Sequence, residues 1–265
     1  GYLPGMTIEG LMQTAAEAKN KSVERIEVLC QWVTQGVEPH IEPSEWKALQ
    51  VPPADLRISK DARTVWAVDT SHDRSTTWVS AAVLTESGKP LVTSRVKRPG
   101  IVWAVGYLRD LAERSGHREV ALQAQGCPVV ELIPLLKAEY EDADGVKRPG
   151  LTVHEMDRPT CAVATGRIHD RVRDKQLVLT EQPDIDIAIE GGLATPYAEN
   201  QLWSRGKSRP VDIAGLCAET WALYALEELE PPAKKEVPPP PKTAALSEDA
   251  ERVTTSEPNL ATIAF

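Results

Sequence analysis

The sequence predicts an α/β fold, in which a mixed sheet carries helices on both faces. Three strand-like apolar runs come first, and after them segments with helical and strand-like periodicity alternate. The 265 residues are 42% hydrophobic and 26% charged, which is an ordinary globular balance. No apolar run approaches eighteen residues, so the sequence contains no transmembrane helix and we expect no membrane partner.

The first three strands are predicted from apolar runs that are rich in β-branched residues. Residues 64–68 form a continuous apolar run that ends at Asp69, as expected of a buried strand. Residues 76–84 form the second strand. Gly88 allows a turn, after which residues 91–96 return as the third strand. The second and third strands are therefore expected to form an antiparallel hairpin pair.

The chain that follows alternates between helical and extended patterns. Helices are indicated by apolar residues three and four positions apart, and strands by short apolar runs. In order, the predicted elements are helix 102–114, strand 120–122, helix 129–138, strand 151–154, helix 160–172 and a final helix opened by Asp212. This alternation is typical of a sheet covered by helices on both faces.

The two ends of the chain differ from its middle. Residues 1–56 are predicted to form a helical linker segment, too interrupted to be an independent domain. Residues 57–230 are the predicted folded domain. Residues 231–265 begin with prolines and continue in Ala, Thr, Ser and Glu, which predicts a disordered, Pro-rich tail.

Charge and cysteine content exclude several classes of protein. Thirty basic and 39 acidic side chains give a net charge of −9, the wrong sign for a protein that coats nucleic acid. A local basic groove remains compatible with that total. The four cysteines form no CxxC pair, so no zinc site is evident and a disulfide framework is not expected. We expect a reduced, cytosolic protein with buried thiols.

Polar side chains follow the first predicted strand. Asp69 comes directly after its apolar run, at the carboxyl end where α/β sheets bind ligands. Residues 70–75 are all polar, and Asp73 adds a second carboxylate within this stretch. Asp and Ser also cap backbone amides in turns, so a purely structural turn is the alternative.

Two later segments add candidate site residues. Gln123 follows a short strand, and its amide oxygen can bind a hard cation but supplies no charge. Asp212 stands where a helix is expected to begin, and a helix cap is its alternative role. The loop before it carries Arg205, Lys207 and Arg209, which could bind a phosphate backbone beside a metal site. A solvated surface loop is the alternative.

These segments together resemble the C-terminal nuclease domain of the large terminase subunit of tailed bacteriophages, which has an RNase H-like fold. The resemblance covers nearly all of residues 8–229. Residues 68–75 are similar to the family's D-x-S-x-D-R pattern, and residues 123–128 to its D-P-x-G-P turn. Further similar segments are residues 202–205, 211–214 and 218–223, and residues 27–33 and 41–46 look like the stretch that links the packaging ATPase to the nuclease.

The resemblance implies a metal-dependent endonuclease that cuts concatemeric viral DNA during genome packaging. It implies two Mg²⁺ or Mn²⁺ ions about 4 Å apart, bridged by Asp69, with Asp212 completing one of them. Gln123 stands where the family has an acid. Either Asp73 supplies the missing carboxylate, or metal binding is weak, or activity is reduced.

The same resemblance implies partners and a location. The partners are double-stranded DNA, the portal and the small terminase subunit, and the location is the cytoplasm of the infected bacterium. No GxxxxGK[ST] phosphate loop occurs in the chain, so the packaging ATPase is expected to lie elsewhere.

Two alternatives fit the same residues. A Holliday-junction-type RNase H-like nuclease would have similar strands and acids, although the linker-like front segment and the basic loop argue against it. A catalytically weak docking module of the packaging motor would use Asp69 and Asp212 only to cap turns. The acidic composition, Gln123 and the Pro-rich tail favour that second alternative.

Overall fold

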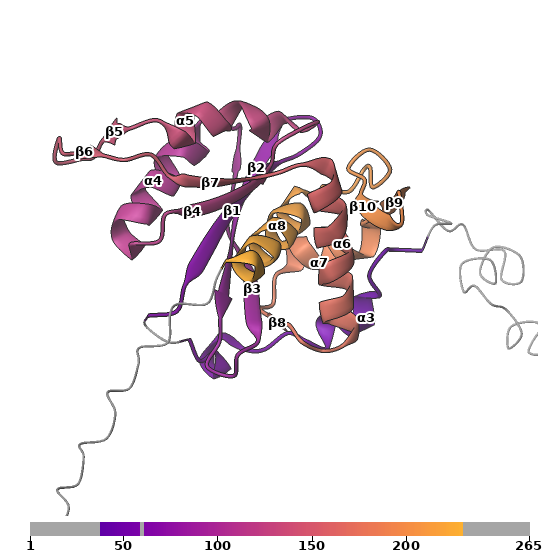
Figure 1. Cartoon of the computed structure of the whole chain (residues 1–265). Coiled ribbons are helices and arrows are strands. Elements are labelled where there is room, and N and C mark those ends of the chain that lie inside the picture. The colour runs from indigo at the N-terminus through magenta and orange to yellow at the C-terminus, as the bar shows by residue number, and fades with distance from the viewer. Residues whose placement is uncertain (1–37, 59–60, 230–265) are drawn as a thin grey trace, which may run out of the picture. The chain divides into compact units, whose positions relative to one another are not determined.

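The computed structural model describes residues 38–58 and 61–229 (Figure 1). Most of the predicted linker segment and the predicted tail lie outside these residues. Within the described part, every helix is too short or too polar to cross a lipid bilayer.

A six-stranded mixed sheet forms the centre of the fold, in the order β7-β4-β1-β2-β3-β8. Strands β2 and β3 pair antiparallel, as predicted, and β1 also pairs antiparallel with β2. Strand β4 is parallel to β1, and β7 is parallel to β4. At the other edge, β8 is parallel to β3. The strands are β1 (Thr64–Thr70), β2 (Thr76–Leu84), β3 (Pro90–Pro99), β4 (Glu119–Gln123), β7 (Thr152–Met156) and β8 (Val178–Leu179).

Helices cover both faces of this sheet, which confirms the predicted fold class (Figure 1). Alternate side chains of β1 point to opposite faces. Trp66 and Val68 share a core with α4 (Trp103–Ser115), and Val65 and Ala67 share a second core with the helices of the other face. Those helices are α6 (Arg158–Arg173), α7 (Pro183–Gly191) and α8 (Ala214–Glu228).

Several elements differ from the prediction or were not predicted. Residues 129–138, predicted as one helix, form a 3-10 turn η2 (Pro128–Leu132) and a short helix α5 (Ile133–Lys137), each with a proline in its first turn. Helix α7, strand β8 and two hairpins were not predicted, because they are too short to show a periodic pattern. The hairpins are β5 (Tyr140–Glu141) with β6 (Lys147–Arg148), and β9 (Ala194–Tyr197) with β10 (Asn200–Trp203).

The described part of the predicted linker packs against the sheet domain. It contains α3 (Pro43–Lys47) and the 3-10 turn η1 (Pro53–Asp55). Ile41 and Trp46 are buried in the core that α6, α7 and α8 share. The His40 amide donates to the Gly192 carbonyl at 3.0 Å. Residues 38–50 therefore belong to the same folded body as the sheet.

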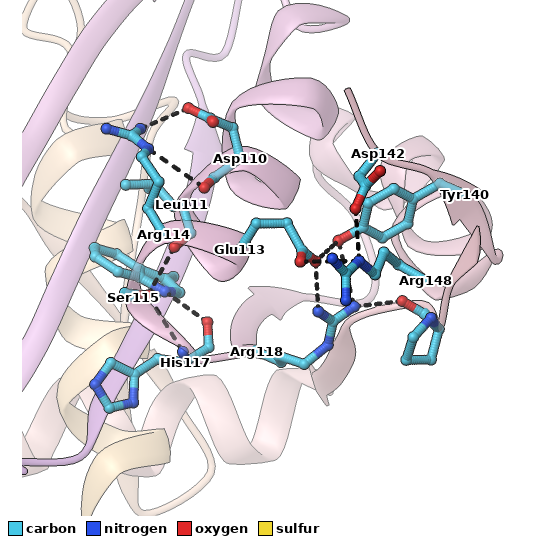
Figure 2. Close-up of polar contacts among 12 residues, drawn as sticks. Asp110, Leu111, Glu113, Arg114, Ser115, His117, Arg118, Tyr140, Asp142 and Arg148 are labelled. Carbon is cyan, nitrogen blue, oxygen red and sulfur yellow. Dashed lines mark hydrogen bonds and ion pairs between the residues drawn. The ribbon is translucent and has the colours of Figure 1, made fainter. Parts of the chain in front are cut away.

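A network of ion pairs joins the β5–β6 hairpin to α4 (Figure 2). Glu113 accepts hydrogen bonds from Tyr140 at 2.6 Å and from Arg118 at 2.8 Å, and it pairs with Arg148 at 3.3 Å. Arg148 also pairs with Asp142 at 2.7 Å. A cavity of about 520 Å³ lies among these side chains. Because its charges are largely neutralised by one another, we do not place the functional site there.

Candidate functional site

The predicted site residues meet at the carboxyl ends of β1 and β4. These two strands are parallel, so Asp69 near the end of β1 and Gln123 at the end of β4 lie at the same edge of the sheet. Arg205 connects them, because its Nη2 pairs with Asp69 Oδ2 and its Nη1 donates to Gln123 Oε1 at 3.0 Å. Asp212 interacts electrostatically with Asp69. The fold thus gathers residues that are far apart in the sequence.

Asp69 is completely buried. Its Oδ1 accepts a hydrogen bond from the Thr70 amide at 2.8 Å, and its Oδ2 pairs with Arg205. Burial raises the pKa of the Asp69 carboxyl, while Arg205 and the Thr70 amide oppose that rise. The carboxylate therefore depends on a neighbouring cation to stay charged.

Arg205 lies in the interior, although it was predicted on a cationic surface loop. Its side chain is 12% exposed. Burial is the largest influence on Arg205 and disfavours its charge, but the neighbouring acidic groups, Asp69 first among them, together raise the pKa of the guanidinium. Three cysteines, Cys127, Cys161 and Cys217, lie close enough to Asp69 and Arg205 to interact with their charges. Burial raises the pKa of each of these thiols, that of Cys127 to about 12. Neutral thiols therefore leave Asp69 as the counter-charge of Arg205.

The Gln123 amide is oriented locally. Its Nε2 donates to the Gln125 carbonyl at 2.6 Å, so its Oε1 is left to accept from Arg205. The chain then turns at Gly126, whose φ of 73° favours glycine. The end of β4 and the turn that follows it therefore position Gln123 Oε1.

Asp212 is fixed by two hydrogen bonds. Its Oδ2 accepts from Trp78 Nε1 at 3.0 Å, and its Oδ1 accepts from the Ala214 amide at 3.0 Å, in the first turn of α8. Trp78 is the register partner of Asp69 on β2. Asp212 therefore caps the first turn of α8 and is also held by Trp78, the residue beside Asp69 on the neighbouring strand.

Asp73 stabilises the turn between β1 and β2. Its Oδ1 accepts from Ser71 Oγ at 2.6 Å and from the Ser75 amide and hydroxyl at 3.0 and 2.7 Å. These hydrogen bonds hold the pKa of Asp73 well below its usual range. All three bonds end on Oδ1, so Oδ2 keeps its capacity as an acceptor. Asp73 and Asp212 line the same cavity.

That cavity has a volume of about 360 Å³ and is lined by Asp73, Asp212, Arg205 and Arg209. Lys97 of β3 also lines it. The Lys97 ammonium lies 4.8 Å from the centre of the Trp78 ring and 3.2 Å from Asp184. Lys97 was not among the predicted site residues, although it lies in a basic run with Arg95 and Arg98 that could have indicated it.

The comparisons with known proteins bear on the fold. No protein-family model and no curated protein matches the chain. Among solved structures, the large terminase of bacteriophage HK97 superimposes with a TM-score of 0.53 over 83% of this chain, at 16% sequence identity. This chain shares the fold of the superimposed part of that protein. It spans about half of that protein, 51% of its length. The predicted resemblance and the RNase H-like fold class are confirmed.

Two isolated nuclease domains from phage terminases are also similar to this chain. The nuclease of thermophilic phage G20c has 13% identity and a TM-score of 0.44, covering 64% of this chain and 85% of its own. The nuclease domain of Thermus phage P74-26 has 12% identity and a TM-score of 0.45, covering 68% and 92%.

The oxygen donors at this edge of the terminase fold suit a hard divalent cation. The Asp69 carboxylate and the Gln123 amide oxygen converge on one cationic group, the guanidinium of Arg205. Carboxylate and amide oxygens are ligands that Mg²⁺ and Mn²⁺ prefer. Among residues 38–58 and 61–229, however, no three His, Cys, Asp or Glu side chains are grouped to hold a metal ion. Asp69 and Gln123 therefore supply one charged and one neutral oxygen ligand at this sheet edge.

Proposed function

We propose that this chain is the nuclease region of a DNA-packaging terminase, a metal-dependent endonuclease that cuts concatemeric viral DNA. The observation that carries the proposal is the meeting of Asp69, Gln123 and Asp212 at one sheet edge of the terminase fold. In this proposal the partners are double-stranded DNA, the portal and the small terminase subunit. The place of action is the cytoplasm of the infected bacterium.

The proposal assigns a role to each acid. Asp69 and Asp212 hold Mg²⁺ or Mn²⁺, and Gln123 adds a neutral oxygen. A bound divalent cation supplies activation of water and stabilisation of the leaving oxygen. Hydrogen bonds from Trp78 and the Ala214 amide fix the Asp212 carboxylate. A second ion requires another carboxylate, and Asp73, which shares the cavity with Asp212, is the residue we assign to it.

A plasmid-nicking assay tests this function. We expect the purified chain to convert supercoiled plasmid to nicked and linear forms with Mn²⁺, and to be inactive with a chelator. Asp212→Asn is the inactive control. Cleavage of branched junctions without cleavage of plasmid would support a junction-resolving nuclease instead. Absence of both activities would support a docking module.

The cavity also predicts where DNA binds. Lys97 and Arg209 line it, and Lys207 is exposed on the neighbouring loop. Replacing all three by Ala should weaken duplex binding and flatten its salt dependence. Each lost phosphate contact lowers the slope of log K against log[salt] by roughly 0.9, or about 2.7 in total. The slope is measured by titrating a labelled duplex at several salt concentrations.

A matched variant controls for net charge. Arg114, Lys137 and Arg173 are half exposed or more, and none of them lines the cavity. Replacing these three by Ala removes the same total charge and should leave the slope nearly unchanged. Equal slopes for the two triple variants would place the DNA elsewhere.

A further inference from the structure

The guanidinium of Arg205 contacts two of the proposed metal ligands, Asp69 and Gln123. It pairs with Asp69 Oδ2 and donates to Gln123 Oε1 at 3.0 Å. The Asp69 side chain is 0% exposed and that of Arg205 is 12% exposed, so water screens this ion pair poorly. The chain itself therefore supplies a cation to the two ligand oxygens.

A divalent cation and this guanidinium cannot both be bound by the same oxygens. The charge of Arg205 cancels that of Asp69, and Gln123 contributes none. A metal ion that arrives while Arg205 is in place finds the Asp69 carboxylate already compensated, and only Asp212 and Asp73 in the cavity carry charge that no cation pairs with in the described residues. We propose that Arg205 is an internal cation that competes with the metal ion for Asp69 and Gln123, and that DNA binding releases it.

DNA offers Arg205 an alternative anion. Arg205 lines the same cavity as Arg209, where the proposed function places the DNA backbone. Phosphate oxygens bind guanidinium groups in bidentate fashion, as carboxylates do. Within the described part of the chain, the buried Arg205 Nε has no hydrogen-bond partner, so it is a donor that a phosphate could satisfy. Transfer of Arg205 from Asp69 to a phosphate leaves the Asp69 carboxylate for the metal ion.

This exchange couples the two ligands. DNA should tighten metal binding, and by linkage the metal ion should tighten DNA binding by the same factor. The DNA-release step rests on the proposed function, whereas the competition between Arg205 and the metal ion does not. The Arg205–Asp69 ion pair would therefore keep metal occupancy of the site low until DNA binds.

The first test uses Mn²⁺ alone and the melting temperature of the full chain. Arg205→Gln should melt at a lower temperature than the wild type without metal, because Asp69 is left buried without a counter-charge. Mn²⁺ should restore its stability, with an apparent affinity at least about tenfold tighter than that of the wild type. The matched control Arg209→Gln removes the same charge from the same cavity but leaves Asp69 paired. An equal Mn²⁺ response of Arg205→Gln and the wild type would overturn the proposal.

The second test keeps the wild-type chain, in case Arg205→Gln does not fold. Titration calorimetry measures Mn²⁺ affinity with and without a short phosphorothioate duplex that resists cleavage. We expect the duplex to tighten Mn²⁺ binding about tenfold. Mn²⁺ affinity that is independent of the duplex would overturn the coupling. Loss of nicking with the coupling intact would refute the endonuclease function alone, and nicking without the coupling would refute only the role of Arg205.

Discussion

Replacing Asp69 by Asn is expected to abolish plasmid nicking and to destabilise the fold. Asn keeps the shape of the side chain but loses the charge that binds a cation, so cleavage should fall at least about a hundredfold. The same change leaves the buried Arg205 guanidinium without a counter-charge. Removing one partner of a buried ion pair costs about 3–5 kcal/mol. Nicking rates and urea unfolding measure the two effects separately.

A double variant separates stability from activity. Asp69→Asn combined with Arg205→Gln removes both buried charges, so much of the lost stability should return. Nicking should not return, because the carboxylate is still absent. A double variant as unstable as Asp69→Asn alone would show that an unpaired charge is not the cause of the destabilisation.

The second large effect concerns Glu219, and Glu219→Gln is expected to stabilise the protein at alkaline pH. Glu219 lies completely buried on α8, where its Oε1 accepts from Ser94 Oγ at 2.9 Å and from Gln182 Nε2 at 3.2 Å. Within the described residues its Oε2 has no partner. Burial raises the pKa of Glu219 from 4.5 to about 7.

The sign of the pH effect follows from that rise. The folded chain binds the Glu219 proton more tightly than the unfolded chain does. The resulting stability is fully present below pH 4.5 and is lost as pH rises through about 7. The total loss is about 3 kcal/mol. Gln is neutral at every pH, so Glu219→Gln should match the wild type near pH 4 and exceed it by about 3 kcal/mol at pH 8.

Urea unfolding at both pH values checks this expectation. Glu228→Gln is the matched control, because Glu228 lies on the same helix but is 53% exposed and pairs with Arg167 at 2.8 Å. Its effect should stay within about 0.5 kcal/mol. Equal stability of Glu219→Gln and the wild type at pH 8 would show that Glu219 is not forced to ionise in the interior.

The strands and long helices could be predicted because their signals are local. The run ending at Asp69 is continuous and apolar, and Gly88, with φ of 80°, allows the turn between β2 and β3. The β9–β10 hairpin and α7 could not be predicted, because four to nine residues show no clear period. Their existence depends on packing against elements that are distant in the sequence.

The candidate site was predictable in its residues but not in its contacts. Strand ends and a helix start identify Asp69, Gln123 and Asp212 without any structure. The sequence could not predict that the Arg205 side chain points inward. Arg205 stands beside Lys207 and Arg209 in a basic segment, which is typical of an exposed loop, and those two neighbours are indeed exposed. Only the folded chain brings the buried charge of Asp69 close enough to draw Arg205 inward. The connection of Asp212 to Trp78 likewise depends on strand register.

The contact between His40 and Gly192 has a consequence for slow opening motions. Gly192 precedes Leu193, whose carbonyl accepts from the Ser204 amide at 2.8 Å and whose amide donates to Ser208 Oγ at 3.0 Å. The loop that carries Arg205 is therefore joined through backbone hydrogen bonds to the segment at residue 40. Amide protons on both segments should exchange with deuterium at similar rates, as members of one cooperative unit. Local unfolding near residue 40 would then also free the loop that carries Arg205, the residue that pairs with Asp69.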